Sequence, residues 1–95
     1  MTQQKSVATL AAVSGDLKLY VKNWCPWCVT AKSWLNRHGY RFQEFDVDRN
    51  RVAYDEMIAL SGQTYTPTLV VDGKVLPDFG PEELEAFLKK HSITP

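Results

Sequence analysis

The chain has 95 residues, 44% of them hydrophobic, and its 11 basic and 11 acidic residues cancel, so we expect one domain with a modest core. The zero net charge excludes a general nucleic-acid binder, and no stretch reaches the roughly 18 apolar residues of a membrane span. The sequence has only two cysteines, too few for a secreted scaffold held together by disulfides. Together with the scattered His38 and His91 they do not supply the ligand spacing of a zinc finger. We therefore expect a cytoplasmic protein that holds no metal.

Residues 1–14 precede the first predicted element. They hold a single lysine and a short apolar run, Val7–Val13, which is shorter and less apolar than the centre of a signal peptide. We expect a weakly ordered tail here and one folded domain over residues 15–95.

A strand, a helix and a second strand follow. Residues 17–21 (LKLYV) form a short apolar run with strand character. Residues 26–38 are predicted to be helical, because they open on a proline and a glycine follows them. Residues 41–47 (RFQEFDV) predict a second strand, with Phe42 and Phe45 on opposite faces. The inner face of the helix is predicted to carry Cys28, Ala31 and Leu35, with Trp34 beside them.

A second helix, a hairpin and a last helix complete the pattern. Residues 50–60 are predicted to be helical and to end before Gly62. Residues 68–71 (TLVV) predict a third strand, and the turn sequence Asp72-Gly73 returns the chain into a fourth strand at 75–76. Gly80-Pro81 opens the last helix. The inner faces of the two helices are predicted to carry Ala53, Met57 and Leu60, and Leu84, Phe87 and Leu88.

The two cysteines lie in the segment Trp24-Cys25-Pro26-Trp27-Cys28, between the first strand and the first helix. That context is typical of a redox pair. Cys25 falls at the N-cap, where unpaired N–H groups and the helix dipole favour a thiolate, so we expect its pKa below the free value of about 8.5. Cys28 lies one turn further on, where we expect a buried resolving thiol.

The segment also allows other interpretations. A lone pair of cysteines can be half of a metal site, or two inert buried residues, but no second ligand pair is present. Lys22 adds a positive charge upstream, although a lone lysine is more often a solvated surface residue. Trp27 is expected at the surface beside the reactive sulfur, as a platform for a substrate chain. Trp24 is expected to be a packing residue.

A second segment of interest is Tyr65-Thr66-Pro67, directly before the third strand. A proline is tolerated as the first residue of a strand, and the pattern alone favours this simple interpretation. The alternative is a cis peptide bond, which exposes the backbone of Thr66 for pairing with an extended substrate.

With both segments described, the chain resembles the glutaredoxins, within the thioredoxin-like superfamily, over roughly residues 17–91. The resemblance rests on Lys22 ahead of the Cys-Pro-Trp-Cys motif, on Thr66-Pro67 and on Asp72-Gly73. The predicted elements themselves give the order β-α-β-α-β-β-α and a small mixed four-stranded sheet flanked by three helices, and the resemblance implies that this α/β fold is thioredoxin-like. It also implies a cis bond before Pro67. We expect a monomer.

The resemblance implies a role for each matching residue. Cys25 is the nucleophile and Cys28 the resolving cysteine of a dithiol enzyme. The predicted groove for glutathione and substrate is lined by Lys22, Trp27, Tyr65, Thr66 and Pro67. We expect no bound cofactor, with glutathione as one candidate co-substrate.

One departure from the family pattern concerns the donor of electrons. Glutaredoxins usually carry a Gly-Gly pair after the last strand, next to residues that hold a carboxylate of glutathione. Here Pro77 and Asp78 stand in that place. Asp78 repels a carboxylate, and Pro81 removes an N–H from the start of the last helix. Glutathione and thioredoxin reductase therefore both stay open as the electron donor.

The leading hypothesis is a thiol–disulfide oxidoreductase that reduces disulfide-containing or glutathionylated proteins through Cys25 and Cys28. One alternative, also implied by the family, is a dimer that holds an iron–sulfur cluster through Cys25 and glutathione thiols. A third is a thioredoxin-like module that only docks a partner.

Overall fold

The computed structural model of the chain describes residues 17–95. The predicted tail at residues 1–14 lies outside the described residues. The elements are β1 (Leu17–Val21), α1 (Pro26–Arg37), β2 (Phe42–Asp46), α2 (Arg51–Ser61), β3 (Thr68–Val71), β4 (Lys74–Pro77) and α3 (Pro81–Lys90). Their order confirms the predicted α/β pattern.

The four strands form one mixed sheet in the order β2-β1-β3-β4. β1 and β2 run parallel, with Leu17 opposite Phe42. β3 runs antiparallel to both β1 and β4. The turn between β3 and β4 has φ values of 51° at Asp72 and 78° at Gly73. Positive φ at both central residues is what a tight two-residue hairpin of type I′ requires, and it explains why this dipeptide predicted the turn.

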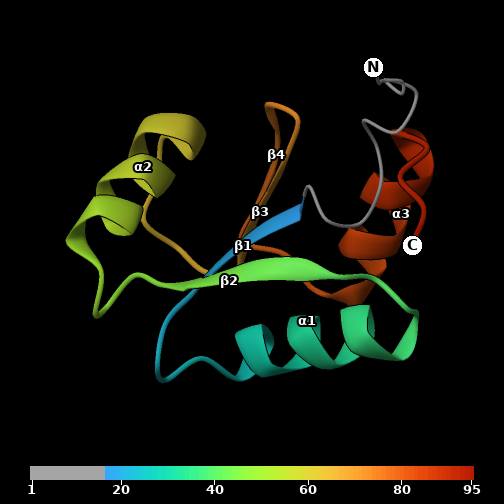
Figure 1. Cartoon of the computed structure of the whole chain (residues 1–95), viewed down its shortest axis with the longest axis horizontal. Helices are drawn as coiled ribbons and strands as arrows, with labels where there is room; N and C mark the ends of the chain where they lie inside the picture. Colours follow the sequence, from blue (N-terminus) through green and yellow to red (C-terminus); the bar gives the residue numbers. More distant parts are fainter. Residues whose placement is uncertain (1–16) are drawn as a thin grey trace, which may run out of the picture.

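Both faces of the sheet are covered by helices (Figure 1). α1 and α3 cover one face, where their buried residues pack with those of β1 and β3 in a single cluster. α2 covers the opposite face and packs Ala53 and Met57 against Tyr20 and Val70. Because side chains alternate along a strand, Leu19 and Tyr20 of β1 belong to different clusters. Phe42 and Phe45 likewise pack on opposite faces, as predicted.

The helix ends follow from local sequence. Cys25 and Asn50 are N-caps with extended backbone, and their side chains accept N–H groups of Cys28 and Ala53. α2 ends at Gly62, whose left-handed φ of 73° suits a glycine. His38 and Asn50, which the sequence assigned to the two helices, are their caps, so α1 ends and α2 begins one residue inside the predicted bounds. β2 is one residue shorter than predicted at each end.

Two sequence predictions are wrong in detail. Leu60 does not line the inner face of α2, since it is 44% exposed. Ser61, four residues after Met57, points its hydroxyl back to the Met57 carbonyl oxygen at 2.6 Å. β4 is also longer than predicted, because Lys74 and Pro77 extend its pairing to Val71 and Thr68. Within residues 17–95, no helix has the length and apolar character that a membrane crossing needs.

Candidate active site

Cys25 and Cys28 form a disulfide at the start of α1. Their Cα atoms lie 5.1 Å apart, a separation that one helical turn provides and that a disulfide accepts. The two sulfurs differ in access, because Cys28 is 1% exposed and packs in the core, whereas Cys25 is only partly buried. The accessible sulfur is therefore the N-terminal one.

The Cys25 sulfur lies at the N-terminus of α1, the positive end of the helix dipole. The Cys28 N–H donates to Cys25 Sγ at 3.1 Å. The first N–H groups of a helix have no partner within the helix. Pro26, the first residue of α1, has no N–H, so one of these unpaired groups is absent. The first turn of α1 contains no acidic side chain. The helix dipole and this N–H therefore act on the sulfur without an opposing charge nearby in the helix.

The loop before β3 completes the surroundings of Cys25. The Thr66–Pro67 peptide bond is cis, as the family resemblance implies. Cys25 Sγ lies 3.7 Å from the Thr66 carbonyl oxygen and accepts a hydrogen bond from Thr66 Oγ1 at 3.5 Å. Thr66 thus lies against the disulfide, although it is 41 residues further along the chain than Cys25.

Two side chains hold this loop in place. Lys22 Nζ donates to the Thr64 carbonyl oxygen at 2.9 Å. The Gln63 amide nitrogen donates to Thr68 Oγ1 at 3.1 Å, and its oxygen accepts the Tyr65 N–H at 2.6 Å. Lys22 is thus joined to the loop rather than to either sulfur. Gln63 was not identified from the sequence, since no motif distinguishes a glutamine that bonds within its own loop.

Large apolar side chains around the disulfide are open to solvent. Trp27 is 58% exposed and Tyr65 63% exposed. Trp24 is 88% exposed, so the prediction that it is a packing residue is wrong. It lies in the turn between β1 and α1, where no element covers it. Val29, in the first turns of α1, is also exposed.

A small cavity lies on the Trp27 side of the disulfide, where the start of α1 meets the loop between β4 and α3. Its volume is about 300 Å³, and it is lined by Trp27, Asp78, Phe79, Gly80 and Glu83. Asp78 has a φ of 51°, and its N–H donates to the Pro67 carbonyl oxygen at 2.8 Å. This bond ties the cavity to the cis-proline loop.

The start of α3 is capped by its own side chain. The Gly80 N–H donates to Glu83 Oε1 at 2.9 Å, and Pro81, the next residue, has no N–H to offer. A glutamate three residues after the N-cap is the sequence signal of this arrangement. Asp78 and Pro81 were identified from the sequence, whereas Glu83 was not, because Gly80 is not among the residues that usually open such a pattern.

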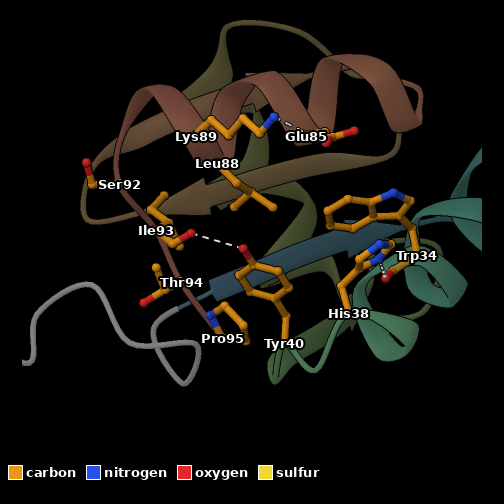
Figure 2. A pocket seen from close by; sticks show the side chains of 10 residues that line it. All are labelled: Trp34, His38, Tyr40, Glu85, Leu88, Lys89, Ser92, Ile93, Thr94 and Pro95. Atoms are coloured by element: carbon orange, nitrogen blue, oxygen red, sulfur yellow. Dashed lines mark hydrogen bonds and ion pairs between the residues drawn. The ribbon is translucent and has the colours of Figure 1, made fainter.

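A second cavity lies away from the disulfide. It measures about 530 Å³ and is formed by the last turns of α1, Tyr40, α3 and the chain after α3. Figure 2 shows Tyr40 donating to the Ile93 carbonyl oxygen, and His38 beside Trp34. His38 stacks on Trp34, with ring centroids 3.9 Å apart. Trp34 lies nine residues after Cys25, about 13 Å along the helix, so this cavity is separate from the redox pair.

Possible metal ligands do not gather among residues 17–95, where no group of three histidine, cysteine or acidic side chains could hold an ion. His38 and His91 instead contact the aromatic rings of Trp34 and Phe87.

Comparison with known sequences identifies relatives of the chain. The sequence profile of the glutaredoxin family matches residues 17–76. Glutaredoxin 3 of Escherichia coli K12 is 37% identical over 59 residues, which are 62% of this chain and 71% of that protein. An uncharacterized glutaredoxin-like 8.6 kDa protein in the rubredoxin operon of Clostridium pasteurianum is 28% identical over 74 residues, or 78% of this chain and 99% of that protein.

Solved structures agree with the sequence relatives. The crystal structure of the thioredoxin-like protein BC3987 superimposes with a TM-score of 0.71 at 32% identity, covering 76% of this chain and 99% of that one. The glutaredoxin of Archaeoglobus fulgidus gives a TM-score of 0.70 at 20% identity and supports the fold, covering 79% of this chain and 87% of that one. The thioredoxin-like fold predicted from the sequence is confirmed.

Proposed function

The chain belongs to the glutaredoxin family of thiol–disulfide oxidoreductases, and from that premise we propose that it reduces disulfides of protein substrates by a dithiol route. Cys25 is the nucleophile in this proposal and Cys28 the resolving thiol. The observation that carries it is the disulfide at the start of α1, with one accessible and one buried sulfur.

The reaction begins with the reduced protein. The Cys25 thiolate, favoured by the Cys28 N–H and the helix dipole, attacks one sulfur of the substrate disulfide. A bond forms between Cys25 and that sulfur, and the other substrate sulfur leaves as a thiolate that takes up a proton. Cys28 then loses its proton and attacks Cys25 Sγ, which closes the Cys25–Cys28 disulfide and releases the second substrate thiol. Two electrons have passed to the substrate.

A polypeptide substrate is supported by the open surface around the pair. Trp24, Trp27 and Tyr65 expose large aromatic area beside the disulfide, which is typical of surfaces that bind other proteins. Within residues 17–95, the Thr66 N–H has no hydrogen-bond partner. This backbone group can pair with an extended substrate strand that brings its cysteine to Cys25.

The test is disulfide reduction in a purified system, with insulin as the substrate and dithiothreitol as the reductant. We expect Cys25→Ser to lower the rate to that of dithiothreitol alone, because no nucleophile is left. In a separate mixture without dithiothreitol, pre-reduced Cys28→Ser should stop after the first step and accumulate a mixed disulfide, which mass spectrometry detects as the added mass of the substrate. A Cys25→Ser protein that works at the wild-type rate would refute the proposal.

For the electron donor, we propose a thioredoxin reductase rather than glutathione. Asp78 and Glu83 place two carboxylates on the Trp27 side of the disulfide. Glutathione carries two carboxylates and only one ammonium group, so this part of the protein surface repels glutathione. Paired assays with the same protein substrate compare NADPH plus thioredoxin reductase against NADPH, glutathione and glutathione reductase. Faster turnover with glutathione would contradict this assignment.

A further inference from the structure

The cavity beside Trp27 has properties that point to a particular class of substrate. It opens next to the redox pair, because Trp27 stands between the two cysteines and Asp78 is hydrogen-bonded to Pro67. Any polypeptide that brings its cysteine to Cys25 therefore places the neighbouring side chains close to this cavity.

The charge of the cavity is negative. Asp78 and Glu83 both line it, and none of its lining residues is basic. Neither carboxylate forms an ion pair within residues 17–95, where the acidic partners of the recorded pairs are Glu44, Asp46, Asp55 and Glu85. Glu83 accepts only the Gly80 N–H, so both carboxylates are available to a cation from outside.

An aromatic wall adds a second, independent attraction for a cation. The Trp27 ring lies over Gly80, since a Cβ built on this glycine would be 3.5 Å from Trp27 Cζ3. The ring is nevertheless 58% exposed, which leaves surface for a ligand. The face of a tryptophan ring attracts a lysine or arginine cation, and a long, narrow side chain of this kind suits a volume of about 300 Å³.

We infer that this cavity receives a lysine or arginine side chain of the substrate, located within a few residues of the substrate's disulfide cysteine. Asp78 and Glu83 supply the charge and Trp27 the aromatic contact. The inference rests on the proposed function, and it names the substrate class as polypeptides with a basic residue near the cysteine to be reduced.

The test compares peptides that differ at one position. Each carries one cysteine as a mixed disulfide with 2-mercaptoethanol, a neutral thiol, and a lysine, glutamine or glutamate at one of three positions on either side of it. Pre-reduced protein is mixed with each peptide without any electron donor, and the oxidation of the protein is followed by mass spectrometry. We expect the lysine peptide to react about three- to tenfold faster than the glutamate peptide at its best position, with a smaller ratio in high salt.

Matched variants assign the effect to the cavity. Asp78→Asn with Glu83→Gln removes both charges, and the glutamine side chain can still accept the Gly80 N–H. The ratio of the rates for the lysine and glutamate peptides should then fall to the ratio measured when dithiothreitol, in place of the protein, reduces the same peptides. Glu82→Gln removes a neighbouring charge that does not line the cavity, and it should keep the wild-type ratio.

The outcomes separate this inference from the proposed function. If all peptides react rapidly and the ratio is the same in wild type and in Asp78→Asn/Glu83→Gln, the inference is overturned and the oxidoreductase stands. If no peptide reacts faster with the protein than with dithiothreitol, the inference and the proposed function are both overturned. Correct folding of each variant is checked beforehand by its urea unfolding midpoint.

Discussion

At the scale of single residues, Tyr20 shows how a buried polar group is satisfied. It is fully buried in β1 on the α2 side of the sheet, and its hydroxyl donates to Glu56 Oε1 at 2.6 Å. Burial, followed by the hydrogen bond to Glu56 and its negative charge, raises the pKa of Tyr20 above the ordinary value of a tyrosine. The neutral phenol is therefore part of the folded state.

Alkaline pH should reveal this residue. Above about pH 10 the tyrosine of the unfolded chain loses its proton, whereas folded Tyr20 keeps it, so the unfolded state binds fewer protons and stability falls as the pH rises. Tyr20→Phe should cost about 1 kcal/mol at neutral pH and show a shallower alkaline decrease. Urea unfolding of the oxidised protein between pH 7 and 11 measures both, and an equally steep decrease in the variant would contradict the assignment.

Lys22 has a positioning role in the structure, because its ammonium group binds the Thr64 carbonyl oxygen two residues before Thr66. Lys22→Met keeps the apolar stem but removes this bond. We expect a two- to tenfold lower kcat/KM for a protein disulfide, which corresponds to roughly 0.4–1.4 kcal/mol, and little change in the urea midpoint. Lys22→Arg retains a hydrogen-bond donor and should recover most of the lost activity. If it does not, the site depends on the shape of the lysine side chain and not on a donor alone.

At the scale of elements, α2 offers a test that is separate from the redox chemistry. Asn50 caps this helix, with its side-chain oxygen accepting the Ala53 N–H at 3.0 Å. Asn50→Ala should lower the free energy of unfolding by about 1 kcal/mol, while the rate of disulfide reduction stays the same because α2 contributes no residue to the site. Asn50→Asp keeps the cap and serves as the control, and equal losses in both variants would contradict the capping role.

Local signals explain why most elements could be predicted from the sequence. Pro26 and Gly62 mark a helix start and a helix end through their own backbone preferences, and Asp72-Gly73 specifies its turn in the same way. Leu60 was misplaced because positions three and four residues after Met57 both fit a helical stripe, and only tertiary packing selects between them.

The site could be predicted only where its residues are close in sequence or carried by a family motif. Cys25 and Cys28 are defined by their spacing and by the helix that follows. Thr66 was located through the family pattern, and the structure puts it in contact with Cys25. Glu83 was missed because its importance depends on α3 beginning beside Trp27, a juxtaposition that the sequence does not display.

At the scale of the whole molecule, stability should depend on the two clusters that sandwich the sheet. Leu69 is fully buried on β3, whereas Leu60 is 44% exposed at the end of α2, which makes them a matched pair. Leu69→Ala should cost about 2–5 kcal/mol, a large part of the 5–15 kcal/mol typical of a domain. Leu60→Ala should cost less than about 1 kcal/mol. Urea unfolding compares them, and similar losses would contradict the observed core.

The sheet order has a consequence for how molecules behave when crowded together. Among residues 17–95, β2 and β4 are the outermost strands. β2 displays Gln43 and Glu44 to solvent, and β4 begins with exposed Lys74 and ends with Pro77, which has no N–H to donate. Charges and a proline on edge strands hinder a neighbouring molecule from adding its own strand. Amyloid-like growth along the sheet is thereby discouraged at both margins, even though aromatic surface stays open around the cysteines.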